Sequence, residues 1–249
     1  DTIINSYRSY TDLKTHYQGT DYNWQRFVRK YRAKPDDTDD TLKLFPNLTT
    51  LWCEDNRNFT DAGLAHLPQL TTLYCWTNRT FTDAGLAHLP HLTTLYCGNN
   101  KTFTDAGLAH LPHLTTLNCW NNTTFTDAGL AHLTHLTTLE CGWNENLTDA
   151  GLAHLTRLTA LHCWNNKNFT DAGLAHLPNL TTLECGNNNF TNAGLAHLTR
   201  LTALHCGGNK TFTGAGLAHL PHLTTLYCGN NNFTNAGLAH LPHLTTLYC

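Results

Sequence analysis

The chain lacks methionine and is poor in charge: 13% of its 249 residues are Asp, Glu, Lys or Arg, and the formal net charge is −3. A field this weak does not favour nucleic acid or an anionic membrane as a partner. No apolar run approaches the roughly 20 residues that a membrane-spanning helix needs, and no signal-peptide pattern opens the chain. Because Met is missing and the last repeat stops at Cys249, we expect a fragment or a processed product.

The chain also lacks the motifs of catalysis and metal binding. It has no C-x-x-C pair, no phosphate-binding glycine loop, and no Ser or Cys nucleophile beside an exposed base. One His per repeat, such as His66 and His88, forms a row, but helices about 8–10 Å apart would hold these imidazoles too far apart to share an ion. We therefore expect an exposed polar helix face, no metal, no cofactor and no enzymatic activity.

The chain instead contains one sequence repeat in nine consecutive copies. From Leu48 to His243 it runs L-T-T-L-x-C-x-x-N-x-x-F-T-D-A-G-L-A-H-L-P-x, with seven copies of 22 residues and two of 21. A tenth copy begins at Leu244. A fixed period in this range predicts a solenoid in which each copy forms one coil.

The first half of each copy has the pattern of a strand and a buried turn. In the second copy, Leu70, Leu73 and Cys75 alternate so that their side chains enter one core. Asn78 recurs at its position in all nine copies, and its amide can bond the turn backbone and the Asn of the next coil. Phe81 is predicted to fill the core beside this ladder of Asn side chains.

The second half of each copy has the pattern of a short helix. Thr82 is a good N-cap residue, and Asp83 suits the positive end of the helix that follows. Gly85 stands in mid-helix, where Gly costs up to ~1 kcal/mol relative to Ala. Because Gly recurs there in nine copies, we expect neighbouring helices to pack too closely for a Cβ.

These motifs resemble leucine-rich repeats, in the version with a short outer helix and a T-D-x-x-L-x-x-L signature. The A-G-L-A-H-L segment, Ala84 to Leu89 and its equivalents, is similar to the GALA-type repeats of bacterial proteins. The resemblance implies an α/β fold: a right-handed horseshoe with a parallel inner sheet and short outer helices. It says little about function, because this scaffold serves many binding tasks.

We divide the chain into an N-terminal cap, residues 1–47, and a repeat domain, residues 48–249, with nine full copies and one partial copy. Helical signals in the cap run from Tyr22 to Tyr31. GALA proteins often carry an F-box, which links a cullin-type ubiquitin ligase to its substrate. The cap is interpreted as an end cap or an F-box-like remnant, because the second half of that motif is loosely similar to Ile4, Tyr7, Asp12, Leu13, Trp24 and Val28.

All ten Cys occupy one repeat position, where the strand pattern points the side chain into the core. We expect buried structural thiols in a reducing, cytoplasmic compartment, either of the protein's own cell or of a host cell. The ten residues are Cys53, Cys75, Cys97, Cys119, Cys141, Cys163, Cys185, Cys206, Cys228 and Cys249.

Three positions around each Cys vary while the rest of the repeat is nearly constant. They are the residue before Cys, the residue after it and the next residue, and we call them the pre-Cys row, the post-Cys row and the third row. A solenoid fold predicts that all three rows lie on its concave face. They are rich in Trp and Tyr, the residues that most often anchor interfaces. The predicted ligand-binding residues are Trp52, Tyr74, Trp76, Tyr96, Trp120, Glu140, Trp143, His162, Trp164, Glu184, His205 and Tyr227.

In the post-Cys row, Trp76, Trp120 and Trp164 alternate with glycines. Two interpretations remain open. Trp side chains two strands apart, at ~10 Å, can hold one planar group over the bare Gly between them. Alternatively, each Trp folds over its neighbouring Gly and shields backbone.

The sequence thus predicts a non-enzymatic recognition module whose concave face binds a protein or peptide, with a glycan as the second ligand class. One alternative is the substrate receptor of a cullin-type ubiquitin ligase, acting as a bacterial effector with a degenerate F-box that docks the ligase adaptor. Another is a structural protein that self-associates end to end through the open strand at Cys249.

Overall fold

The computed structural model describes residues 24–249, which form one 11-stranded parallel sheet with its strands in sequence order. The strands are β1 (Lys30–Arg32), β2 (Thr50–Trp52), β3 (Thr72–Tyr74), β4 (Thr94–Tyr96), β5 (Thr116–Asn118), β6 (Thr138–Glu140), β7 (Ala160–His162), β8 (Thr182–Glu184), β9 (Ala203–His205), β10 (Thr225–Tyr227) and β11 (Thr246–Tyr248). The α-helices are α2 (Asp39–Lys43), α3 (Asp61–Leu64), α4 (Asp83–Leu86), α5 (Asp105–Leu108), α6 (Asp127–Leu130), α7 (Asp149–Leu152), α8 (Asp171–Leu174), α9 (Asn192–Leu195), α10 (Gly214–Leu217) and α11 (Asn235–Leu238).

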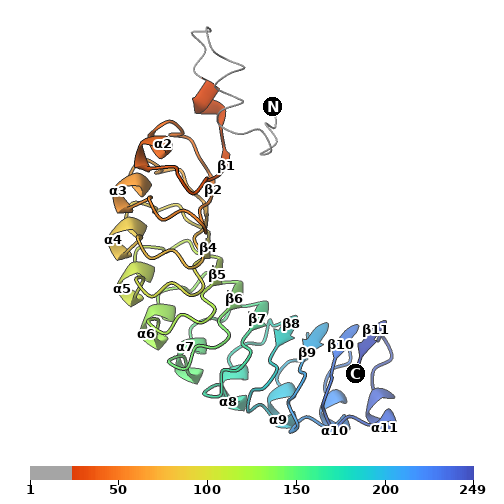
Figure 1. Ribbon diagram of the computed structural model, residues 1–249. Helices are drawn as coiled ribbons and strands as arrows, with labels where there is room; N and C mark the ends of the chain where they lie inside the picture. Colours follow the sequence, from red (N-terminus) through yellow and green to blue (C-terminus); the bar gives the residue numbers. More distant parts are fainter. Residues whose placement is uncertain (1–23) are drawn as a thin grey trace.

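The molecule is an arc with the strands on its inner side and the short helices on its outer side (Figure 1). Neighbouring strands pair without any slip, so that Leu73 of β3 faces Leu95 of β4 and each repeat position forms a column across the sheet. The predicted α/β solenoid is therefore confirmed. None of the helices in the described part of the chain is long and apolar enough to cross a bilayer.

The core is a set of columns of identical side chains. Leu73, Phe81 and Leu86 of one coil are fully buried, as are their equivalents in the coils between β2 and β10. Leu147, which replaces Phe in one copy, is buried in the same way. Because each coil is covered on both sides by its neighbours, this apolar burial is realised only in the assembled array.

The buried Asn column confirms the predicted ladder. The side-chain oxygen of Asn78 accepts the backbone N–H of Phe81 at 2.9 Å, and its Nδ2 donates to the carbonyl of Asn56 in the preceding coil at 3.2 Å. In the second half of the array, the N–H of Asn144 donates to Oδ1 of Asn166 in the next coil at 2.7 Å. The ladder therefore satisfies backbone groups that the coil geometry buries.

The helix starts are joined from coil to coil by a contact that the sequence did not reveal. Thr82 caps α4 by accepting the N–H of Ala84, as expected. The N–H and hydroxyl of Thr82 in turn donate to the two carboxylate oxygens of Asp61 in the preceding coil, at 2.8 and 2.6 Å. A Cβ on Gly85 would lie 2.3 Å from Oδ1 of Asp61, which confirms that glycine is needed for close packing.

The helix expected from Tyr22 to Tyr31 is wrong for the end of that range, because Tyr31 lies in a strand that pairs with the first repeat. A 3-10 helix, η1 (Trp24–Phe27), leads into β1, which extends the sheet by pairing with β2. Leu42 and Phe45 are buried against the first coil, so this segment covers the end of the core. Among the residues compared with an F-box, Ile4, Tyr7, Asp12 and Leu13 lie outside the described residues.

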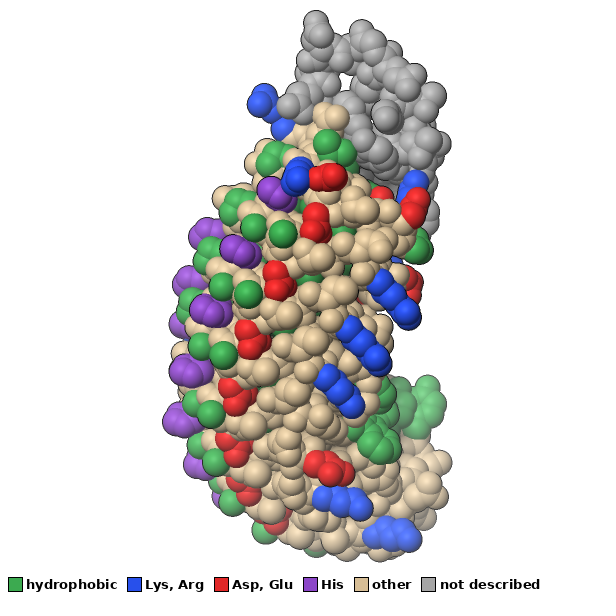
Figure 2. Space-filling view, turned by 60° about the vertical axis from the view of Figure 1, so that its left-hand side comes forward, with side chains coloured by type: hydrophobic (Ala, Val, Ile, Leu, Met, Phe, Trp, Pro, Cys, Tyr) green, Lys and Arg blue, Asp and Glu red, His purple; other side chains and the backbone are tan. Residues whose placement is uncertain are grey.

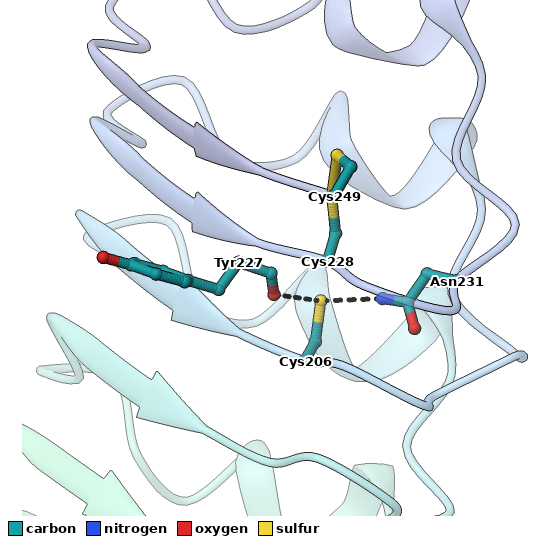
Figure 3. Close-up of a disulfide and its surroundings, with 5 residues drawn as sticks. All are labelled: Cys206, Tyr227, Cys228, Asn231 and Cys249. Carbon is teal, nitrogen blue, oxygen red and sulfur yellow. Dashed lines mark hydrogen bonds between the residues drawn. A yellow bond between two sulfur atoms is a disulfide. The ribbon is translucent and has the colours of Figure 1, made fainter.

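Eight of the ten Cys are free and buried, as predicted. Burial raises the pKa of the Cys119 thiol to about 12, so these thiols stay protonated at neutral pH. The expectation is wrong for the last pair, because Cys228 and Cys249 form a disulfide (Figure 3). Their Cα atoms are 4.7 Å apart, within bridging range, and the exposed Cys249 side chain is not held in the core.

Candidate ligand-binding face

The last residue of each strand from β2 to β10 belongs to the pre-Cys row, and register pairing joins these residues into one line across the sheet. Trp52 faces Tyr74, Glu140 faces His162, and His205 faces Tyr227. The twelve residues selected from the sequence lie in or directly after these strands, and each of them is partly or fully exposed. The fold thus brings them to one continuous concave surface.

At the N-terminal end of this surface the aromatic rings cover one another. The rings of Trp52 and Tyr74 are stacked at 5.3 Å, and those of Tyr74 and Tyr96 at 4.6 Å. The guanidinium carbon of Arg32 lies 5.3 Å from the Trp52 ring centroid, with Nη1 3.9 Å from the carboxylate of Glu54. This end therefore already holds a cation between an aromatic ring and a carboxylate.

The centre of the pre-Cys row is a chain of charged and polar groups. Glu184 accepts hydrogen bonds from Nδ1 of both His162 and His205, each at 3.1 Å. The hydrogen bond to Glu184 raises the pKa of His162, although burial opposes this shift, and the same bond lowers the pKa of Glu184. Asn118, at the equivalent position in β5, is buried and donates to Glu140.

At the C-terminal end the row becomes aromatic again. The rings of His205 and Tyr227 lie 4.2 Å apart, and Tyr227 is stacked on Tyr248 at 4.5 Å with an interplanar angle of 12°. Tyr248 was not among the twelve selected residues, although it stands at the same repeat position as Tyr227. Its side chain is 59% exposed.

Of the two interpretations of the Trp and Gly alternation, the second, in which a Trp covers its neighbouring Gly, holds at Trp120. Cδ1 of Trp120 lies 3.2 Å from the position that a Cβ on Gly142 would occupy, so this Trp folds over the neighbouring backbone. No atom of Trp164 comes within 4 Å of the corresponding point on Gly186. The backbone beyond Trp164 is therefore left open.

The recurrence of Asn in the third row is explained by the backbone conformation, which the sequence pattern did not reveal. Its residues adopt positive φ angles of 52–61° in seven copies, and Asn is common there because it tolerates this left-handed conformation. Thr77 and Trp143 are the two residues of this set that are not Asn, and Trp143 has a φ of 60° with 51% of its surface exposed. A bulky side chain in this region is strained, and such strain is often found at functional sites.

The outer face is chemically separate from the concave rows. Figure 2 shows His side chains projecting along the helix ridge, a parallel line of acidic side chains beside them, and Lys and Arg at a different edge. The repeated His residues, such as His88 and His110, are all exposed. Among residues 24–249, no three His, Cys, Asp or Glu side chains are placed to hold a metal ion.

Comparison with known sequences finds no matching protein-family model and no matching curated protein. Solved structures do match. The crystal structure of a TLR13–ssRNA13 complex has a TM-score of 0.70 at 20% identity, over 90% of this chain and 36% of that chain. The Toll–Spatzle complex of Drosophila has a TM-score of 0.63 at 19% identity, over 88% of this chain and 35% of that chain.

A third match is the functional domain of InlJ from Listeria monocytogenes, which includes a cysteine ladder. It has a TM-score of 0.56 at 26% identity, over 90% of this chain and 58% of that chain. This chain thus spans about a third of the length of the matched chains in these two complexes and over half of the InlJ chain. By its sheet, its outer helices, its Asn and Cys columns and these neighbours, the chain has the fold of a leucine-rich-repeat solenoid.

Proposed function

We propose that the chain is a recognition module that binds a protein or peptide ligand on its concave face. The observation that carries this proposal is the register-aligned surface that includes Trp143, Trp164 and Tyr227, whose side chains are 51%, 48% and 37% exposed. Large aromatic side chains lose apolar contact with water when a partner covers them, and Trp and Tyr dominate the binding energy of many interfaces.

The charge of the face favours a polypeptide ligand over nucleic acid. The three concave rows, from Trp52 to Asn230, contain the carboxylates of Glu54, Asp55, Glu140 and Glu184 but no Lys or Arg. Phosphate groups are usually bound by Lys and Arg, so this face does not suit them. TLR13 and Toll are described in complexes with ssRNA and Spatzle, respectively, which illustrates that related folds hold different ligands.

The A-G-L-A-H-L segment supports a GALA-type origin of the repeats.

A displayed library of random peptides, panned on the immobilised chain, tests this function. Enriched peptides are then measured against a Trp120→Ala, Trp164→Ala variant and against a matched His110→Ala, His154→Ala variant of the outer helix face. We expect the concave variant to lose at least tenfold in affinity and the outer variant to stay within twofold. Enriched peptides that bind both variants equally, or that lose affinity only for the outer variant, would overturn the proposal.

A further inference from the structure

An open groove with a volume of about 470 Å³ lies at the C-terminal end of the concave face. Its floor is the run of post-Cys residues Gly186, Gly207 and Gly229. This run interrupts the alternation of Trp and Gly in the earlier coils. A volume of this size is typical of pockets that hold a small ligand or one large side chain.

The floor carries no side chains because all three of its residues are glycine. The backbone conformation does not require glycine at these positions. None of these three residues has a positive φ. A Cβ on Gly229 would meet no atom within 4 Å, and one on Gly207 would meet only the carbonyl oxygen of Gly229, at 3.4 Å. Side chains therefore fit sterically at these two positions, and their absence leaves space above the sheet.

The side of the groove is fixed by a chain of contacts. Glu184 holds His205 through a 3.1 Å hydrogen bond, His205 packs on Tyr227 at 4.2 Å, and Tyr227 stacks on Tyr248 at 4.5 Å. Trp164, which is half exposed, closes one end. Because these rings are held in place before a ligand arrives, little side-chain ordering opposes binding.

Two observations indicate which chemical group binds in the groove. One is the charge of the concave rows, and the other is the contact of Arg32 with Trp52 and Glu54 in the same chain. The concave rows hold four carboxylates and no Lys or Arg, so they attract a cation. At the opposite end of the same face, Arg32 lies over Trp52 and beside Glu54. The groove has exposed aromatic surface at Trp164 and Tyr248 and no Lys or Arg in its lining. The carboxylate of Glu184 lies next to the groove, 3.1 Å from Nδ1 of its lining residue His205.

Resting on the function proposed above, we infer that the groove over Gly186, Gly207 and Gly229 binds an arginine side chain of a basic peptide ligand. A planar guanidinium stacks on aromatic faces and is weakly hydrated, so it suits a groove with an aromatic side and a nearby carboxylate better than an ammonium does. A sugar ring fits less well, because its many hydroxyls need partners and the exposed lining of the groove is mostly apolar.

The test uses three ten-residue Gly-Ser peptides that carry arginine, lysine or citrulline at two central positions. Citrulline keeps the shape of arginine without its charge. Binding to the whole chain is measured by calorimetry and by quenching of Trp emission at pH 7.5. We expect the arginine peptide to bind at least tenfold more tightly than the citrulline peptide, with the lysine peptide between them. Equal affinity for the arginine and citrulline peptides would overturn the inference.

The site itself is tested with two leucine variants, one in the groove and one on the outer helix face. A Cβ on Gly229 meets no atom within 4 Å, so Gly229→Leu places its side chain in the groove and should weaken binding of the arginine peptide at least tenfold, whereas His154→Leu, on the exposed outer face, should leave its affinity within twofold. An unchanged affinity in Gly229→Leu, or a loss in His154→Leu alone, would place the peptide elsewhere and overturn the inference. If the arginine peptide does not bind while library peptides still depend on the concave tryptophans, the groove inference fails and the proposed function stands.

Discussion

Asp61 of one coil and Thr82 of the next form a bidentate contact, in which the threonine N–H and hydroxyl each donate to a separate carboxylate oxygen, at 2.8 and 2.6 Å. The same contact joins Asp39 to Thr60, Asp105 to Thr126 and Asp149 to Thr170. It links the outer helices directly, so the convex side of the array is held together by hydrogen bonds as well as by apolar packing.

Removing one of these carboxylates should destabilise the array. Asp105→Ala leaves the N–H and hydroxyl of Thr126 without their partner, and we expect a loss of about 2 kcal/mol in the free energy of unfolding. Urea denaturation followed by circular dichroism measures it.

Asp105→Asn is the matched control. Asn192 already makes the equivalent contact in another coil, accepting the N–H of Thr213 at 3.0 Å and donating to its hydroxyl oxygen at 2.8 Å. The Asn variant should therefore lose less than half as much as the Ala variant. Equal stability of Asp105→Ala and the parent chain would show that the contact is dispensable.

Gly107→Ala should destabilise the chain although Ala is the better helix former by about 1 kcal/mol. The added Cβ would lie 2.3 Å from Oδ1 of Asp83, which cannot move aside without breaking its contact with Thr104. We expect a loss of about 1–3 kcal/mol, measured by urea denaturation. In an Asp83→Ala background the same substitution should be neutral or stabilising, and a cost that persists there would contradict the steric explanation.

Glu184→Gln should change the pH dependence of stability in a defined window. The raised pKa of His162 contributes stability that is complete below its ordinary value of 6.5 and is lost as the pH rises through the folded pKa. The lowered pKa of Glu184 contributes stability above its ordinary value of 4.5 that is lost as the pH falls through the folded pKa.

Both contributions are present between about pH 4.5 and 6.5, so the parent chain should exceed Glu184→Gln most in that window, by at most about 1 kcal/mol because solvent screens the pair. Thermal melts of the two proteins at half-unit steps from pH 4 to 9 give the difference directly. A difference that is constant across this range would contradict the assignment.

Trp143→Asn should stabilise the chain. Trp143 has a φ of 60°, and Asn occupies the equivalent left-handed position in five other copies, such as Asn121 and Asn165. Relief of this strain should add about 1 kcal/mol to the free energy of unfolding, visible as a rise in the melting temperature. Trp164→Asn, at a position without positive φ, is the control and should give no gain. A fall in stability for Trp143→Asn would mean that its ring packs more than its exposure indicates.

Features that depend on one coil could be read from the sequence. The inward alternation of Leu73 and Cys75, the buried Asn78 and the cap at Thr82 all follow from local spacing. The concave location of the aromatic residues followed as well, because an unbroken repeat leaves one register for stacking the coils.

Features that depend on how two coils meet could not be read in this way. The contact from Asp61 to Thr82 spans 21 residues and needs the helix starts to be adjacent in space. Likewise, whether the Trp120 ring covers Gly142 depends on the side-chain torsions of Trp120. The left-handed third row left a local signal in its recurrent Asn, which became interpretable only with the φ angles in hand.

The eight buried thiols, one per coil from Cys53 to Cys206, have a consequence for how the array can be studied. A protonated sulfur sealed in the interior reacts with an alkylating reagent only during local opening, so each coil carries a native chemical reporter of its own fluctuations. Rates of alkylation, resolved by peptide mass, would give an opening free energy for every coil of the unaltered chain. A one-dimensional assembly of this kind should then reveal where along its length it first comes apart.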